Sequence, residues 1–407
     1  MDGIVVVDLQ RMRFYYHPLL AVVHVSIAFH QPPNCHIHRY HPTSSTTSRK
    51  EPFFYAATKD AHIVETNKEY LINTLGYTND KVQEMNQTTN ILTLDIGIIE
   101  ERANWLTRRL KLNSYELKRI IRHQPHVLGK RSDTNLGPTI DYLQSRLNLN
   151  DNALRKLILS APHLLPCSIE DNIEPKLDWL QERLQLNDVQ LGKMITRQPY
   201  TLGCSITENL EPTINWIQKR LHVNDATISK IMRTNPQIMH LNIESNLEPT
   251  MNWLQQRLQL DDTALSTLIQ RMPQILGLSI DDNIEPKLDW LSEHLELDND
   301  ALSSMIQKSS GMLSCKIETN LEPTLHFYIN AIESENSKQE ALKLIVNNPT
   351  LFNYSLENRL KPRLEEAKST GMKIDAAILR RMGQYTDDDW YKVLILYMMR
   401  EDDEDGE

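Results

Sequence analysis

A fifteen-residue segment recurs along this chain at a constant interval of 37 residues. One copy, NLEPTINWIQKRLHV, runs from Asn209 to Val223, and others begin at Asn135, Asn172, Asn246, Asn283 and Asn320. Two proline columns and one aromatic column share this period: Pro138, Pro175, Pro212, Pro249, Pro286 and Pro323; Pro125, Pro162, Pro199, Pro236 and Pro273; Trp105, Tyr142, Trp179, Trp216, Trp253, Trp290 and Phe327. A fixed period of this length indicates a repeat protein, in which chain length does not set the number of domains.

Each unit is predicted to contain two helices. In the first, apolar residues spaced 4, 3 and 4 apart form one stripe, namely Ile173, Leu177, Leu180 and Leu184. Asn172 is the expected N-cap, and Pro175 follows in the first turn, where its missing N–H costs little. A polar column is expected to cap the second helices: Asn113, Asn150, Asn187, Asn224, Asp261 and Asp298. Pro199 should end the second helix, and a single tight turn should connect it to the next unit.

One such pair is too small to bury its own apolar stripe, so neighbouring pairs must stack. The predicted fold is all-α, an α-solenoid superhelix of about seven to eight 37-residue two-helix repeats over residues 62–386. Diverged segments at 70–82 and 358–372 are expected to form the capping units.

The two ends of the chain differ from this body in composition. Residues 9–50 contain no Asp or Glu, which is typical of a transit peptide, so residues 1–61 are predicted to be a disordered organellar targeting leader. An apolar run after Arg13, followed by Phe29, favours a plastid over a mitochondrion and makes Met12 an alternative start to Met1. Residues 387–407 are expected to be a short segment whose acidic tail, 401–407, is solvated and disordered.

No catalytic constellation is present in the sequence. There are only 12 glycines and no phosphate-binding loop, so no enzymatic activity, cofactor or small-molecule substrate is expected. Cys167, Cys204 and Cys315 share a slot of the repeat with Leu241 and Leu278, which predicts a buried apolar position and no metal or disulfide.

Two columns of cations repeat instead. We call Arg109, Arg146, Arg183, Arg220 and Arg257 the Arg ladder, and Arg119, Lys156, Lys193 and Lys230 the Lys column. Either could contact a phosphate backbone that runs along the repeats. Alternatively, each ladder Arg stacks on the Trp of its own unit and pairs with a neighbour's Asp or Glu. The Lys column has no such aromatic partner, which favours nucleic acid there. Arg197, Arg233 and Arg271 lie nearby but form no column.

The exit from the second helices resembles that of a known family. A P-x-x-L pattern occurs at Pro125, Pro162, Pro199 and Pro273, and LGYT at 75–78 fits the same family. These features are similar to the mitochondrial transcription termination factor (mTERF) family. The resemblance implies a curved helical-repeat protein that binds nucleic acid and acts in organellar gene expression.

The leading hypothesis is therefore a monomeric factor that binds duplex DNA or RNA and regulates organellar transcription, its termination, or RNA processing. The alternative is a protein–protein scaffold in an organelle, and neither involves a membrane. Residues 1–50 carry a net charge of +3 and residues 387–407 carry −7, which leaves −6 for the body and favours the scaffold. The scaffold hypothesis would also be favoured if a column of glutamates lies on the same face as the Arg ladder: Glu174, Glu211, Glu248, Glu285 and Glu322.

Overall fold

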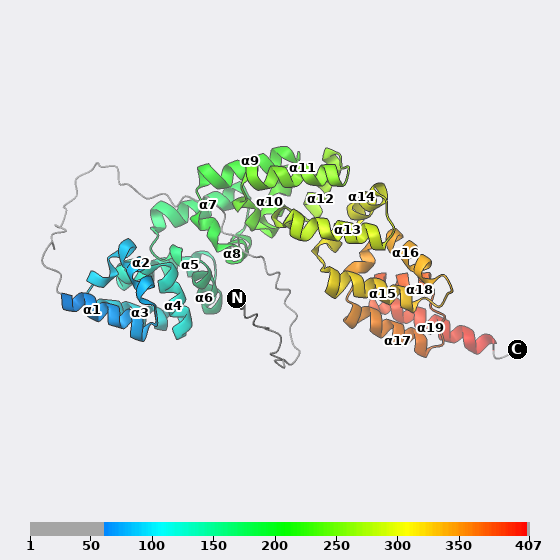
Figure 1. Ribbon diagram of the computed structural model, residues 1–407, viewed down its shortest axis with the longest axis horizontal. Coiled ribbons are helices and arrows are strands. Elements are labelled where there is room, and N and C mark those ends of the chain that lie inside the picture. Colours follow the sequence, from blue (N-terminus) through cyan, green and yellow to red (C-terminus); the bar gives the residue numbers. More distant parts are fainter. Residues whose placement is uncertain (1–60, 405–407) are drawn as a thin grey trace, which may run out of the picture. The chain divides into compact units, whose positions relative to one another are not determined.

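The computed structural model describes residues 61–404, and within them every regular element is a helix (Figure 1). Nine helix pairs follow one another in chain order, which confirms the all-α solenoid of two-helix repeats. The first helices are α1 (Ala61–Glu69), α3 (Ile96–Leu110), α5 (Gly137–Arg146), α7 (Glu174–Arg183), α9 (Glu211–Arg220), α11 (Glu248–Arg257), α13 (Glu285–His294), α15 (Glu322–Ala331) and α17 (Lys361–Ser369). The second helices are α2 (Asn79–Thr89), α4 (Ser114–His123), α6 (Asp151–Ser160), α8 (Asp188–Arg197), α10 (Asp225–Thr234), α12 (Asp262–Arg271), α14 (Asn299–Lys308), α16 (Ser337–Asn347) and α18 (Ala376–Gln384). A final helix, α19 (Asp387–Glu404), follows the ninth pair.

The apolar stripes of neighbouring pairs form one core. Leu177, Leu180 and Leu184 of the α7 unit are fully buried, and the buried cluster extends from Leu71 to Leu394. Several second helices contact the second helix of the next unit, as α8 does α10. Stability is therefore shared between neighbours, as expected of a repeat array.

The start of the first helix differs from the sequence prediction. A π-helical turn, Ile169–Ile173, precedes α7, and Ser168 caps it by accepting a hydrogen bond from the Asp171 N–H at 3.1 Å. Asn172 lies inside this turn, so its predicted role as N-cap is wrong. The turn is wide because the Glu174 N–H donates to the Ile169 carbonyl five residues earlier. Pro175, which has no N–H to donate, follows Glu174 directly in the first turn of α7.

The ends of six first helices share an unusual backbone conformation. Their terminating residues have φ between 48° and 55°, in the left-handed region, and none is glycine: Lys111, Asn148, Gln185, His222, Gln259 and Glu296. In the α7 unit, the Leu186 N–H then donates to the Gln181 carbonyl at 2.9 Å. This six-to-one bond closes the helix in the manner of a Schellman motif.

The second helices follow the prediction closely. Asn187 caps α8 by accepting from the Gln190 N–H at 2.9 Å, and the other five members of the polar column cap their helices in the same way. After α8, a 3₁₀ turn at Pro199–Gly203 forms the predicted connector.

The acidic end of the chain is more ordered than predicted. α19 extends to Glu404, so the first four residues of the supposedly disordered tail are helical. The helix is held at its start because Trp390 is buried and its indole N–H donates to Glu366 in α17 at 2.8 Å. The predicted leader, with Met1, Met12 and Cys35, lies outside the described residues. Among the helices that are described, none combines the length and hydrophobicity needed to cross a bilayer.

Candidate nucleic-acid interface

The Arg ladder joins each unit to the next. The Arg183 guanidinium donates to Asn215 at 3.0 Å and to Gln218 at 2.8 Å, both on α9, and to Asp225 at the start of α10 at 3.4 Å. Arg146 makes the same set of contacts one unit earlier, with Asp178 at 3.0 Å, Gln181 and Asp188. Arg109, Arg220 and Arg257 also bond to the unit that follows them.

In four of these five contacts, all except that of Arg257, a glutamine of the next unit also takes part. Gln218 accepts from Arg183 and donates to Asp225 at 2.9 Å, and Gln144, Gln181 and Gln255 repeat this pattern. The ladder side chains are only 20–26% exposed. The guanidinium groups of the Arg ladder therefore form ion pairs with carboxylates of the next unit. Stacking on the aromatic column is seen where histidine replaces arginine, with ring centroids of Trp290 and His294 4.6 Å apart.

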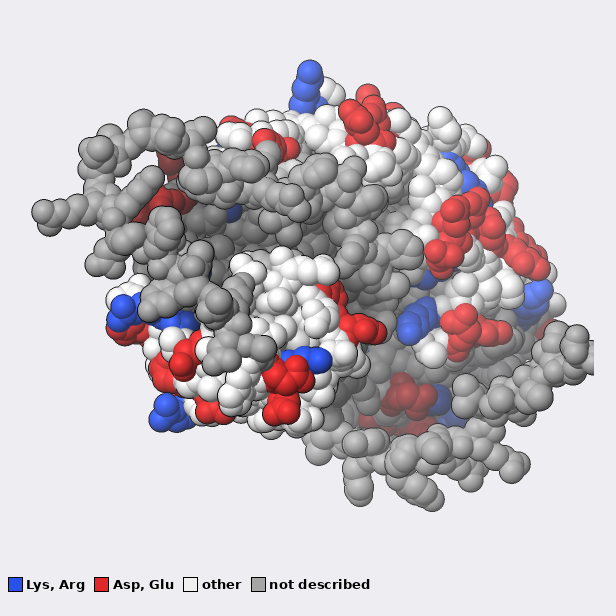
Figure 2. Space-filling model, turned by 60° about the vertical axis from the view of Figure 1, so that its left-hand side comes forward, with Lys and Arg blue, Asp and Glu red and all other residues white. Residues whose placement is uncertain are grey.

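Acids also share the face of the ladder. The Arg257 Nε atom lies 4.0 Å from a Glu285 carboxylate oxygen, so at this unit a member of the glutamate column adjoins the Arg ladder. Figure 2 shows Lys/Arg and Asp/Glu side chains interspersed over the face in view, with no continuous basic patch there. A face of mixed charge attracts polyanions weakly.

The Lys column has the opposite character. Arg119, Lys156, Lys193 and Lys230 are all exposed, and their side chains make no hydrogen bond or ion pair with the described part of the protein. From α4 to α14, every acid of a second helix lies within the first three residues, and every Lys or Arg lies after them. This arrangement suits the helix dipole. It also leaves the C-terminal parts of these six helices with cations only.

Lys343 is a member of this column that the fixed period missed. It lies six residues before Pro349, as Lys193 lies six before Pro199, and it is exposed on α16 without a partner among the described residues. A two-residue insertion displaces it from the 37-residue register. Counting back from the proline would have found it.

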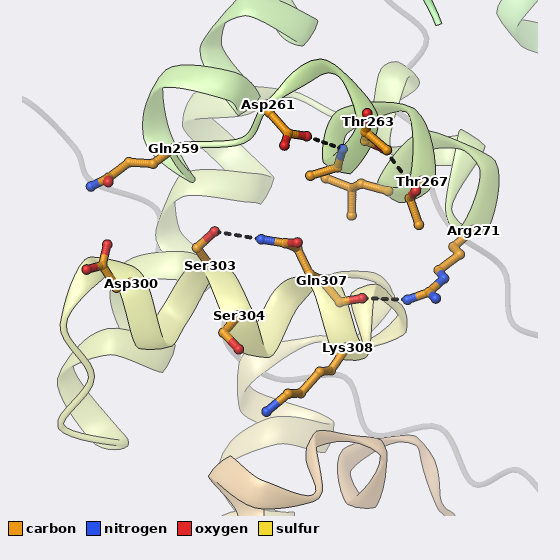
Figure 3. Close-up of a pocket in the computed structure, with 12 residues that line it drawn as sticks. Gln259, Asp261, Thr263, Thr267, Arg271, Asp300, Ser303, Ser304, Gln307 and Lys308 are labelled. Carbon is orange, nitrogen blue, oxygen red and sulfur yellow. Dashed lines mark hydrogen bonds between the residues drawn. The ribbon is translucent and has the colours of Figure 1, made fainter. Parts of the chain in front are cut away.

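A groove lies between consecutive second helices on this side. Between α12 and α14 it has a volume of about 810 Å³ and is lined by Thr267, Ser304, Gln307, Arg271 and Lys308, among others (Figure 3). Thr267 and Ser304 occupy the slot of the Lys column in these two units, so this slot lines the groove here, although neither residue is a cation. The lining of the groove is polar and includes Asp261 and Asp300, so between these two units the groove carries both signs of charge.

Arg197 and Arg271 have a structural role that the sequence did not reveal. Arg197 donates to the Thr234 carbonyl at the end of α10 at 2.5 Å, and Arg271 donates to the Gln307 carbonyl near the end of α14 at 2.6 Å. The two arginines are two periods apart, so they occupy equivalent slots. They bridge consecutive second helices through helix-terminal carbonyls.

The cysteine slot is less buried than predicted and adjoins polar groups. Cys204 is buried, Cys167 and Cys315 are half-buried with free thiols, and burial raises the pKa of the latter two. His240 lies against Cys204, with Nδ1 3.4 Å from Sγ, and its Nε2 is 3.1 Å from the Thr201 hydroxyl. Over residues 61–404, no group of three or more potential ligands is placed to hold a metal.

Comparison with known proteins identifies the class to which this repeat architecture belongs. The family model mTERF matches residues 69–390, which is most of the chain. The protein is therefore a member of the mTERF family, whose members are organellar helical-repeat proteins that bind nucleic acid and are generally not enzymes. No curated protein matches the chain.

Proposed function

We propose that this protein binds nucleic acid through the Lys column and regulates gene expression in an organelle. The observation that carries the proposal is the row of exposed, unpaired cations along the second helices, on segments that contain no acid. Residues 62–386 would form the binding unit, and residues 387–407 a separate terminal segment.

The Lys column supports this role better than the Arg ladder does. A phosphate contact requires a cation free to exchange its counterions for the ligand. Lys193 and Lys230 satisfy this requirement. Arg183 would first have to leave its hydrogen bonds with Asn215 and Gln218. We therefore propose that the ladder sets the spacing of the units and that the column meets the backbone of the polymer.

Binding along such a column would be directed mainly at phosphates. A flexible ammonium group is a point charge, and it reads no base edge by itself. Sequence preference would then come from the shape of the nucleic acid or from a few other side chains. Regulation of transcription, its termination and RNA processing are all compatible with this mode.

The test is a salt titration of binding to labelled duplex DNA and to single-stranded RNA. The triple variant Lys156→Gln, Lys193→Gln and Lys230→Gln should weaken binding, and the slope of log affinity against log salt should fall by roughly 2–3. Tighter binding of duplex DNA would favour a role in transcription, and tighter binding of RNA would favour a role in RNA processing.

The matched control carries the same change of charge elsewhere. Lys338, Lys361 and Lys392 are lysines that pair with surface acids. Changing these three to Gln should leave the salt slope unchanged. Equal losses of nucleic-acid affinity in both triple variants would show that the effect depends on net charge alone. No binding of either polymer at low salt would favour the alternative, a protein–protein scaffold, which the mixed charge around the Arg ladder supports.

A further inference from the structure

The Lys column is interrupted at two consecutive units, where uncharged polar side chains replace its cations. Thr267 holds its slot on α12 and Ser304 holds it on α14, and both side chains are exposed. Three residues further along each helix, and therefore on the same face, comes an exposed glutamine, Gln270 or Gln307. At these units the ammonium groups that suit phosphates give way to hydroxyls and amides, which form directional hydrogen bonds with base edges.

Both glutamines are held in the same way by a buried serine of their own helix. The Gln307 amide nitrogen donates to the Ser303 hydroxyl at 3.1 Å, and that hydroxyl donates in turn to a backbone carbonyl at the end of α11 (Figure 3). Gln270 donates to Ser266 at 3.0 Å, and Ser266 donates to a carbonyl at the end of α9. Because each serine proton is already used, the hydroxyl can only accept from the glutamine, which fixes the orientation of the amide.

Each anchored amide keeps one N–H and its carbonyl oxygen without a partner among the described residues. This pair of groups matches one edge of adenine, which offers the N7 acceptor beside the N6 amino donor. Guanine offers two acceptors, N7 and O6, at the same edge, so the glutamine oxygen would meet O6 without a hydrogen bond. An amide held in this way therefore discriminates adenine from guanine.

A base can approach Gln307 from the groove between α12 and α14, which this side chain lines (Figure 3). The acids of the groove, Asp261 and Asp300, lie at the starts of the two helices, and Asp300 is seven residues before Gln307, about 10 Å along α14. Arg271 and Lys308, the last residues of the two helices, lie at the glutamine's end. Their charges suit the phosphates that flank a bound base.

We propose that Gln270 and Gln307 read two adenines in the nucleic acid that the Lys column binds. The inference rests on the proposed function, in which the Lys column supplies affinity, and adds two residues that supply specificity. Gln270, 37 residues before Gln307, holds the equivalent place between α10 and α12.

The repeat also sets the spacing of the two adenines. Packed helices lie about 8–10 Å apart, which corresponds to roughly three base pairs of duplex DNA. In a duplex the adenines should therefore be about three base pairs apart. In a single strand read one base per unit, they should be adjacent.

The test is a selection of bound sequences from random libraries of duplex DNA and of single-stranded RNA, with the full-length protein. We expect two enriched adenines at the stated spacing in the polymer that binds. Gln307→Met removes the amide but keeps the length of the side chain, so it should abolish enrichment at one adenine and leave the other, and Gln270→Met should do the reverse. The matched control is Gln256→Met, which changes an exposed glutamine of α11 and should keep both.

An exchange of specificity separates base recognition from a structural role. Arg233 on α10 holds the slot equivalent to Gln270 and Gln307, so the repeat accommodates arginine there. Arginine pairs with the two acceptors of guanine. Gln307→Arg should therefore replace one enriched adenine by guanine, a result that neither misfolding nor a general change in affinity produces.

A modified base locates the contact on the nucleic acid. In 7-deazaadenine, carbon replaces the N7 acceptor. Placed at one adenine of a selected sequence, it should weaken binding by the unmodified protein about tenfold and leave binding by the matching Gln→Met variant unchanged. The slope of log affinity against log salt should be the same for both proteins, because glutamine carries no charge.

The proposal would be overturned by selected sequences without the two adenines, by enrichment that survives Gln307→Met and Gln270→Met, or by equal loss of enrichment in the Gln256→Met control. If the salt slope of the Lys column is still observed, that failure concerns the glutamines alone and leaves the proposed function standing. No binding of either polymer would overturn both.

Discussion

Six residues that end the first helices adopt a backbone conformation that favours glycine, yet none of them is glycine. Gln185, for example, has φ 50°. For a residue with a Cβ atom, the left-handed region costs roughly 1 kcal/mol. We expect Gln185→Gly to stabilise the protein by about 0.5–1 kcal/mol, measured as a higher urea midpoint. Glu182→Gly, three residues earlier in α7, should have the opposite effect because its backbone is helical.

His240 should make the stability depend on pH. Burial lowers its pKa from 6.5 to about 4. Between these values the unfolded chain binds a proton that the folded protein does not, so stability is full above pH 6.5 and falls as the pH drops toward 4. The loss attributable to this group is at most about 3 kcal/mol. His163 has a similarly lowered pKa for the same reason.

The check is the urea midpoint of the His240→Gln variant between pH 7 and 4.5. It should fall less steeply with acidification than that of the unmodified protein. His222→Gln is the control, since His222 is exposed and the equivalent slots hold Gln185 and Gln259. Parallel curves for all three proteins would contradict the prediction.

At the scale of the element, the π-helical turns before α7, α9, α13 and α17 each begin with a serine cap. Ser168 satisfies a backbone N–H that would otherwise lack a partner. We expect Ser168→Ala to destabilise the protein by about 1 kcal/mol in thermal unfolding. Ser160→Ala changes an exposed serine that caps no helix and should cost under about 0.5 kcal/mol. Equal losses in the two variants would show that the cap contributes nothing.

Substitutions in the Arg ladder and in the Lys column should have different effects on stability and on nucleic-acid binding. Arg183→Ala removes contacts with three residues of the next unit, so we expect it to lower the free energy of unfolding by about 1–2 kcal/mol. Lys193→Ala should leave stability within about 0.5 kcal/mol because that side chain has no partner. In a salt titration of nucleic-acid binding, the ranking should reverse. A larger fall in salt slope for Arg183→Ala would assign the phosphate contact to the ladder.

At the scale of the whole molecule, the loss of one helix should destabilise only the repeat units that lie next to it. α19 packs on the ninth pair through Trp390, Leu394 and Tyr397. Truncation after residue 386 should therefore speed amide hydrogen exchange in α17 and α18 at least tenfold. Exchange in α9–α12 should not change, because stability in a repeat array is local. A uniform increase along the array would indicate one cooperative unit instead.

The sequence determined the repeating parts of this protein. The 37-residue period, the apolar stripe, the second-helix caps from Asn113 to Asp298 and the proline that ends most second helices are all local features. Each depends on residues within one or two turns of one another, so spacing alone predicts them. The same reasoning found the Lys column, although Lys343 needed the proline and not the period as its reference.

Only the tertiary structure decided what these repeated residues contact. Arg183 meets Asn215, Gln218 and Asp225, which are 32, 35 and 42 residues away, and no local pattern shows which neighbour a long side chain reaches. The cap is Ser168 and not Asn172 because a π turn precedes α7. In the same way, α19 became visible as a two-sided apolar helix only when Trp390 was seen to pack and Ile395 was not. Local spacing fixes which residues share a side of a helix, whereas packing between units decides which side is buried.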